Sequence, residues 1–63
     1  MRSRQIPQLV RDVKAAAVRL DVHLNVIESM EASKAERNCA IALAFSEASY
    51  IQRILQEALT AGS

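Results

Sequence analysis

The chain has 63 residues and a formal net charge of +1; 51% of its residues are hydrophobic, although only Phe45 and Tyr50 are aromatic. A chain this short forms one domain at most, and its own core is marginal without disulfides, a metal or association. An internal disulfide is excluded because Cys39 is the only cysteine, and Cys39 with the single histidine, His23, does not make a zinc site. Association with another chain remains, and we expect no cofactor and no metal.

The first predicted element is a helix from about residue 7 to about residue 28. Pro7, the only proline, suits the first turn of a helix, where its missing N–H costs little. At about 100° per residue, one apolar stripe runs along this helix at the heptad spacing that is typical of bundle packing. The stripe contains Ile6, Leu9, Val13, Ala16, Leu20, Leu24 and Ile27, with Val10 and Ala17 beside it.

A second apolar line lies on another side of the same helix. It contains Ala15, Val18, Val22 and Val26. Single apolar residues on a surface are common, whereas a line at helical spacing is more typical of a contact. We therefore expect the three valines to be buried against a second chain, with tolerated exposure as the alternative.

A short turn at about residues 29–33 separates the first helix from a second one at about residues 34–61. Ser33 and Glu36 have the spacing of a capping box, in which each side chain bonds the other residue's backbone N–H. Short connections favour antiparallel neighbours. The sequence thus predicts an all-α fold, a single antiparallel two-helix hairpin over residues 1–63.

The apolar residues of the second helix cover an arc of roughly 200°, whereas one neighbour needs only about 100°. The arc contains Ala40, Ile41, Leu43, Ala44, Phe45, Ala48, Ile51, Ile54, Leu55, Ala58 and Leu59. Burying one Val, Leu or Ile contributes roughly 1.5–3 kcal/mol, so four or five left exposed would rival a domain stability of roughly 5–15 kcal/mol. We therefore expect two hairpins to dimerise into a four-helix bundle with two-fold symmetry.

Glu47 falls inside this arc, where a carboxylate is costly unless it is paired. It is either a recognition contact with an arginine or histidine across an interface, or the edge of the arc where the carboxylate reaches water. Tyr50 flanks the arc and suits an interface anchor and core packing equally. The candidate self-association or partner interface is Val18, Val22, Val26, Leu43, Glu47, Tyr50, Ile51 and Ile54.

Few residues in this chain are able to carry chemistry. His23 occupies a heptad position, either as a pH-sensitive or partner-bonding group or, more often for such a residue, as a partly buried histidine that a neighbour satisfies. Cys39 has no histidine three or four residues away, so we interpret it as a small apolar residue at the edge of the arc. No Gly-rich loop, nucleophile elbow or pair of catalytic carboxylates occurs. We expect a protein that is not an enzyme.

Basic side chains gather early in the chain. Arg4, Arg11 and Lys14 fall on one side of the first helix and are candidate nucleic-acid contacts. The alternative is a solvated face, because stacking aromatics and a helix-turn-helix pattern are both missing.

In its length, its two antiparallel helices and its expected dimeric bundle, this plan resembles the Rop family of plasmid-encoded RNA-binding regulators. The resemblance is one of architecture, and no functional residue of that family is carried over. It implies a dimeric nucleic-acid-binding regulator, which would use the basic start of the first helix.

The sequence favours a small non-enzymatic regulatory or adaptor protein, of the kind that bacteria and phages encode, acting as a homo-oligomer through helix-mediated protein–protein contact. The alternatives are the Rop-like regulator and a structural subunit of a larger assembly. The longest uncharged stretches, residues 22–27 and 38–46, are far shorter than the roughly 20 residues that span a bilayer. No apolar segment follows Arg2 and Arg4, so we expect a cytoplasmic protein without a secretory signal.

Overall fold

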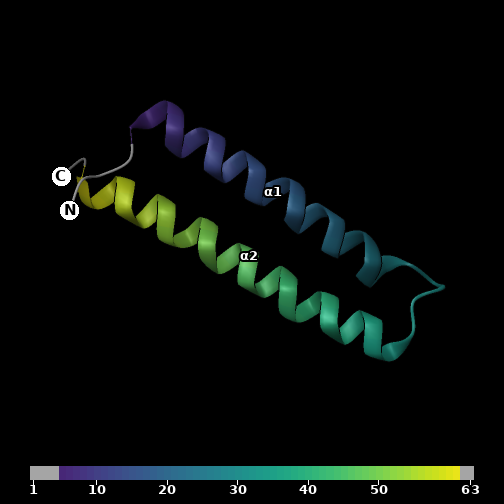
Figure 1. Ribbon diagram of the computed structural model, residues 1–63. Helices are drawn as coiled ribbons and strands as arrows, with labels where there is room; N and C mark the ends of the chain where they lie inside the picture. Colours follow the sequence, from purple (N-terminus) through teal and green to yellow (C-terminus); the bar gives the residue numbers. More distant parts are fainter. Residues whose placement is uncertain (1–4, 62–63) are drawn as a thin grey trace.

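The computed structural model describes residues 5–61, which form two antiparallel helices joined by a short turn (Figure 1). Helix α1 spans Ile6–Glu28 and helix α2 spans Lys34–Ala61, and no strand occurs within the described range. The predicted all-α hairpin is confirmed, whereas its dimerisation stays a prediction. The hairpin is elongated, measuring 45 × 16 × 15 Å, and α1 begins at the same end at which α2 finishes (Figure 1).

Helix α1 begins without a side-chain cap. Gln5 precedes it in an extended conformation and contributes only its carbonyl, which accepts from the backbone N–H of Leu9 at 2.9 Å. Pro7 lies in the first turn, one residue after the helix begins, and no acidic residue occurs there to favour the positive end of the helix dipole. The start of α1 is therefore less well stabilised than the start of α2.

Helix α2 begins with the predicted capping box. The Ser33 N–H donates to the Glu36 carboxylate at 2.8 Å, and the Glu36 N–H donates to the Ser33 hydroxyl at 3.1 Å. The backbone N–H of Ser33, with its hydroxyl as a second contributor, holds the pKa of Glu36 below its usual value because both bonds favour the ionised form. Two N–H groups that the helix cannot satisfy are thereby bonded.

Arg37 from α2 closes the other side of the turn. Its Nε donates to the carbonyl of Ile27 at 3.1 Å, and a terminal nitrogen donates to the carbonyl of Ser29 at 2.8 Å. The last carbonyls of a helix have no partner within that helix, and a cation there also suits the negative end of the dipole. One side chain thus fixes the end of α1 against the start of α2.

The core between the helices is small and contains many alanines. Among residues 5–61 the buried side chains are Leu9 and Ala16 of α1 and Ala40, Ala44 and Ile54 of α2. The buried alanines let the two backbones approach closely, as their small size predicts. A half-buried margin surrounds them, consisting of Val13, Leu20, His23, Ile27, Glu47, Tyr50, Ile51 and Ala58. The hairpin therefore hides few large apolar side chains.

Candidate interaction surface

Far more large apolar side chains lie on the surface of the described hairpin than in its core. Two large residues, Leu9 and Ile54, are buried, whereas eleven are exposed. The exposed set is Ile6, Val10, Val18, Val22, Leu24, Met30, Ile41, Leu43, Phe45, Leu55 and Leu59. Single exposed apolar residues are normal, so what matters is whether these gather on one side.

Helical geometry places most of them on one side of the hairpin. Val10, Ala17 and Leu24 follow one another at intervals of seven residues along α1, rotated about 70–110° from the direction of α2. Ile41, Ala48 and Leu55 do the same along α2, rotated about 60–100° from the direction of α1 and in the same sense. Because the helices run in opposite directions, equal senses of rotation lead to the same side of the hairpin.

We call this surface the side face. Its members from both helices are Ile6, Val10, Ala17, Leu24, Ile41, Ala48, Leu55 and Leu59, all of them exposed, with Phe45 at its outer edge at 74% exposure. It explains most of the excessive width of the apolar arc, because α1 covers only one part of that arc and the side face contains most of the remainder, with the exposed Leu43 outside it. The stripe on α1 divides in the same way, since Leu9 and Ala16 are buried whereas Leu24 is exposed.

The opposite side of the hairpin contains a hydrogen-bonded ion pair. There the Nε of Arg19 donates to the Glu47 carboxylate at 3.0 Å, with the carboxylate side chain 20% exposed. This hydrogen bond, and with less effect the negative charge of Glu47, raises the pKa of Arg19. Glu47 therefore has the arginine partner that its position required, but the partner belongs to the same chain.

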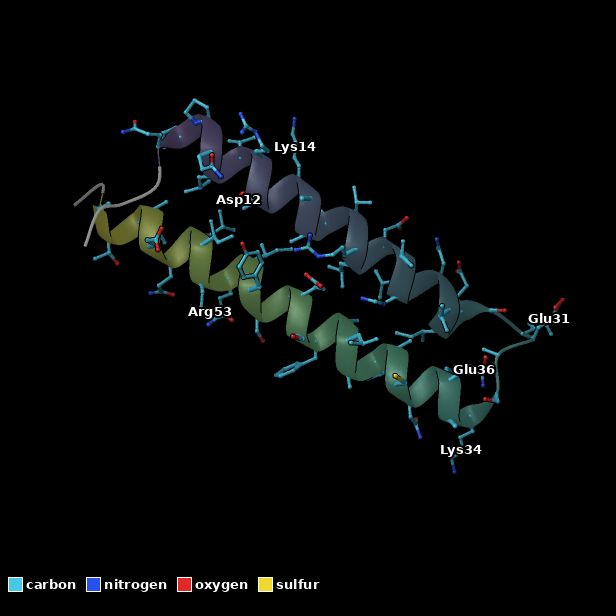
Figure 2. All side chains as sticks on the ribbon, viewed as in Figure 1. Asp12, Lys14, Glu31, Lys34, Glu36 and Arg53 are labelled. Carbon is cyan, nitrogen blue, oxygen red and sulfur yellow. The ribbon has the colours of Figure 1, made fainter. Side chains whose placement is uncertain are left out.

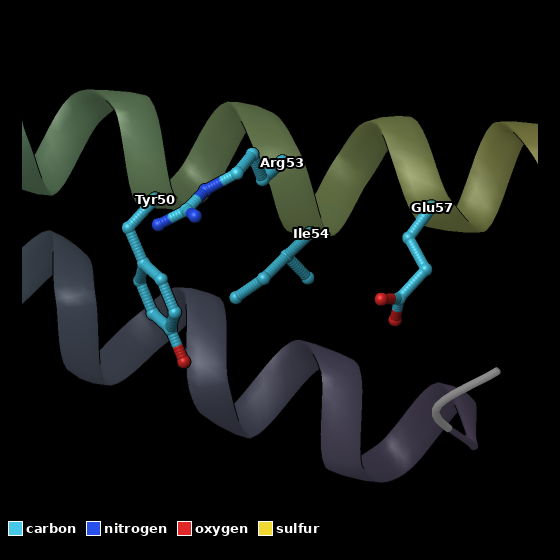
Figure 3. Close-up of a pocket in the computed structure, with 4 residues that line it drawn as sticks. All are labelled: Tyr50, Arg53, Ile54 and Glu57. Carbon is cyan, nitrogen blue, oxygen red and sulfur yellow. The ribbon is translucent and has the colours of Figure 1, made fainter. Parts of the chain in front are cut away.

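A shallow depression of about 200 Å³ lies next to this pair, lined by Tyr50, Arg53, Ile54 and Glu57 (Figure 3). Tyr50 and Ile54 point from α2 toward α1 in Figure 3, where they fill the space between the helices. Small-molecule sites are usually concave and about 300–1,000 Å³ in volume. The depression is therefore a gap along the helix–helix contact rather than a cavity built for a ligand.

The predicted interface residues differ widely in exposure. Ile54 is only 1% exposed, and Glu47, Tyr50 and Ile51 are half-buried, all at the contact between α1 and α2. Leu43 is exposed. The hairpin itself thus accounts for the burial of Ile54, which corrects its assignment to a contact with another chain. Helical spacing defines the width of an arc but not which part of it the neighbouring helix covers.

The second apolar line stands apart from the side face. Val18 and Val22 are 65% and 55% exposed, and they point outward from α1, about 130–170° from the direction of α2. Val26 is half-buried. More than half of each outward side chain is exposed, and their burial against another chain stays a prediction.

The basic candidates lie on the same outward side. Arg11 and Lys14 are exposed, and Lys14 extends away from α2 (Figure 2), whereas Arg4 lies outside the described residues. Cys39, which we interpreted as a small apolar residue at the edge of the arc, is exposed. His23 is half-buried.

Two further searches cover residues 5–61. No cluster of three histidine, cysteine or acidic side chains within this range is arranged to hold a metal ion. Neither α1 nor α2 combines the length and apolar character that crossing a membrane requires.

No protein-family model, no curated protein and no solved structure matches this chain. Function is therefore inferred from the surfaces of the hairpin.

Proposed function

We propose that this chain is a small non-enzymatic regulatory or adaptor protein that acts as a homo-oligomer through helix-mediated contact. One observation supports the proposal above all others: within residues 5–61 the hairpin buries two large apolar side chains and exposes eleven. Seven of these eleven belong to the side face or its edge, so helical geometry places them on one side of the hairpin.

The free energy gained by covering the side face is comparable with the cost of bringing two chains together. Full burial of one such side chain contributes roughly 1.5–3 kcal/mol, so burying the exposed half of seven of them yields roughly 5–10 kcal/mol for each chain. Association costs about 4–15 kcal/mol in lost freedom of motion. Two chains that each bury a side face together gain roughly 10–20 kcal/mol, which matches or exceeds most of that range, whereas one face buried against a polar surface gains only half as much.

The outward side of α1 supports the adaptor part of the proposal. Val18 and Val22 lie on a different side of the hairpin from Leu24 and Leu55, so covering the side face leaves the two valines accessible. A homo-oligomer would then present one such surface from each subunit to a further protein. Arg11 and Lys14 on this side support nucleic-acid binding as the second candidate function, which a salt-dependent retention assay on RNA and DNA addresses.

Mass measurement by light scattering, combined with circular dichroism, tests the proposal. The chain has a mass of 6.9 kDa, so we expect a helical species whose mass is a multiple of this value and which dissociates on dilution. A fully helical, cooperatively folded monomer at millimolar concentration would contradict the proposed function.

A further inference from the structure

We propose that a second copy of this chain covers the side face, running antiparallel to the first, so that α1 packs on α1 and α2 on α2. The two-fold axis then crosses the interface at the level of Ala17 and Ala48. This inference rests on the proposed function, because it names the occupant and the geometry of self-association.

The area of the side face matches that of a stable dimer. A long face of the hairpin measures 45 × 16 Å, or about 700 Å². A standard protein–protein interface buries about 800 Å² on each partner. A single amphipathic helix from another protein would bury less of this face than a second hairpin, which presents two helices to two helices.

The sizes of the residues on the side face are symmetric about its middle. The Arg19–Glu47 contact sets residues 19 and 47 near one level, so Ala17 and Ala48 also lie near one level. Seven residues, about 10.5 Å, separate Ala17 from Val10 on one side and from Leu24 on the other. Ile41 and Leu55 lie at the same spacing from Ala48.

A two-fold axis at the alanines therefore makes the face complementary to itself. Leu24 of each copy lies over Val10 of the other, and Ile41 of each copy lies over Leu55 of the other. At the axis small residues meet small residues, which allows the backbones to approach; the hairpin likewise buries the small residues Ala16 and Ala40 at its own helix–helix contact. The same alternation of small and large layers is typical of helical bundles.

One pair of charges, Lys14 and Asp21, favours the antiparallel arrangement over a parallel one. Lys14 lies three residues before Ala17 and Asp21 four residues after it, and both are exposed at the outer edge of the side face. In the antiparallel dimer Lys14 comes level with Asp21 of the second copy, and this pair occurs twice. In the parallel dimer α1 packs on α2, and Asp21 faces the neutral Phe45.

Glutamate substitutions test which face is covered. Leu24→Glu and Leu55→Glu are each expected to weaken the dimer by about a hundredfold or more, because each buries unpaired carboxylates in an apolar contact. Val22→Glu is the matched control, since Val22 is exposed to a similar degree as Leu24 but lies outside the side face. Circular dichroism reports whether each variant keeps its helices. A dimer that loses no affinity with Leu24→Glu, or that loses as much with Val22→Glu, would overturn this inference.

Disulfide trapping tests the orientation without destabilising the contact. In a Cys39→Ser background, Ala17→Cys lies beside its own counterpart at the axis, where the distance suits a disulfide, so we expect rapid oxidation to a covalent dimer. The control is the parent chain, whose single cysteine is Cys39. This cysteine is exposed outside the side face and is expected to cross-link slowly. If only the doubly substituted Ala17→Cys, Ala48→Cys chain cross-links, α1 packs on α2 and the antiparallel arrangement is wrong.

A charge exchange tests the Lys14–Asp21 pairing separately. Lys14→Asp and Asp21→Lys are each expected to weaken the dimer roughly two- to thirtyfold, and the double exchange to restore most of the affinity. No restoration would contradict the pairing. A dimer that fails these tests overturns the geometry and leaves the proposed function standing, whereas a chain that is monomeric throughout overturns both.

Discussion

At the scale of single residues, three neighbouring side chains determine where this hairpin turns. Ser33 and Glu36 cap the start of α2, and Arg37 bonds two carbonyls at the end of α1. The capping box is visible in the sequence because its two members are three residues apart. The role of Arg37 is not, because its acceptors lie eight and ten residues away and depend on how the chain folds back.

Stability is expected to depend on pH through Glu36. Its folded pKa is lowered, so the ionised carboxylate stabilises the hairpin above the ordinary value of about 4.3, and this contribution is lost as the pH falls through the lowered folded value. Glu36→Gln keeps an acceptor for the Ser33 N–H but cannot titrate. Urea unfolding measured at a pH above about 4.3 and at a pH below the folded pKa of Glu36 gives the free energy of unfolding. This free energy should depend less on pH for Glu36→Gln than for the parent. Glu31→Gln, in the exposed turn, is the control, and an equal change in both variants would refute the assignment.

Removing the guanidinium of Arg37 is expected to destabilise the hairpin by about 1–3 kcal/mol, because two carbonyls at the end of α1 lose a charged donor. Arg37→Met keeps the apolar part of the side chain and isolates this effect. Arg37→Lys should recover only part of the loss, since one ammonium cannot reproduce the fork of two donors. Chemical denaturation measures both, with Arg53→Met as a control on an exposed arginine of the same helix. Equal losses at positions 37 and 53 would show that the two hydrogen bonds do not matter.

At the scale of elements, the two helices differ in how their first turns are satisfied. Helix α2 has a capping box with an acidic residue in its first turn, whereas α1 has neither a side-chain cap nor an acidic residue there. The sequence located both starts, because Pro7 and the Ser33–Glu36 pair act locally. It could not locate the side face, because the rotation of each helix about its own axis is decided by contacts between residues far apart, such as Arg19 and Glu47 at 28 positions' separation.

Gln5→Asp is expected to stabilise the hairpin by about 0.5–1 kcal/mol, because an aspartate at this position accepts from free N–H groups and suits the helix dipole. The matched variant at the other helix is Ser33→Ala, which should lose about 1 kcal/mol. Thermal unfolding followed by circular dichroism measures both. A loss of stability with Gln5→Asp would mean that the start of α1 is satisfied in another way.

At the scale of the whole molecule, folding and association are expected to be one process. The described core contains only five buried residues, and three of them are alanines. The high apolar content of the sequence predicted an excess of apolar surface, and the structure places most of that excess on one side. Ile54, which the sequence spacing assigned to a contact with a second chain, is instead buried within the hairpin.

The melting temperature should therefore depend on protein concentration, decreasing by roughly 3–6 °C for each tenfold dilution, because dissociation accompanies unfolding. Calorimetry over a range of concentrations measures this dependence. Leu24→Glu, if it still folds, should melt at a lower temperature that does not change with concentration. A parent chain whose melting temperature stays constant would indicate that the hairpin is stable alone.

Because α1 begins at the end of the hairpin where α2 finishes, the length of a tether that joins two copies limits the orientations that they can adopt. In an antiparallel pair the end of α2 in one hairpin and the start of α1 in the next are separated by the full 45 Å length. An extended polypeptide advances about 3.3–3.6 Å per residue, so joining two copies in tandem without disturbing that pair takes at least about 13 residues. A shorter tether would force the copies to lie parallel or to assemble between separate tandem molecules.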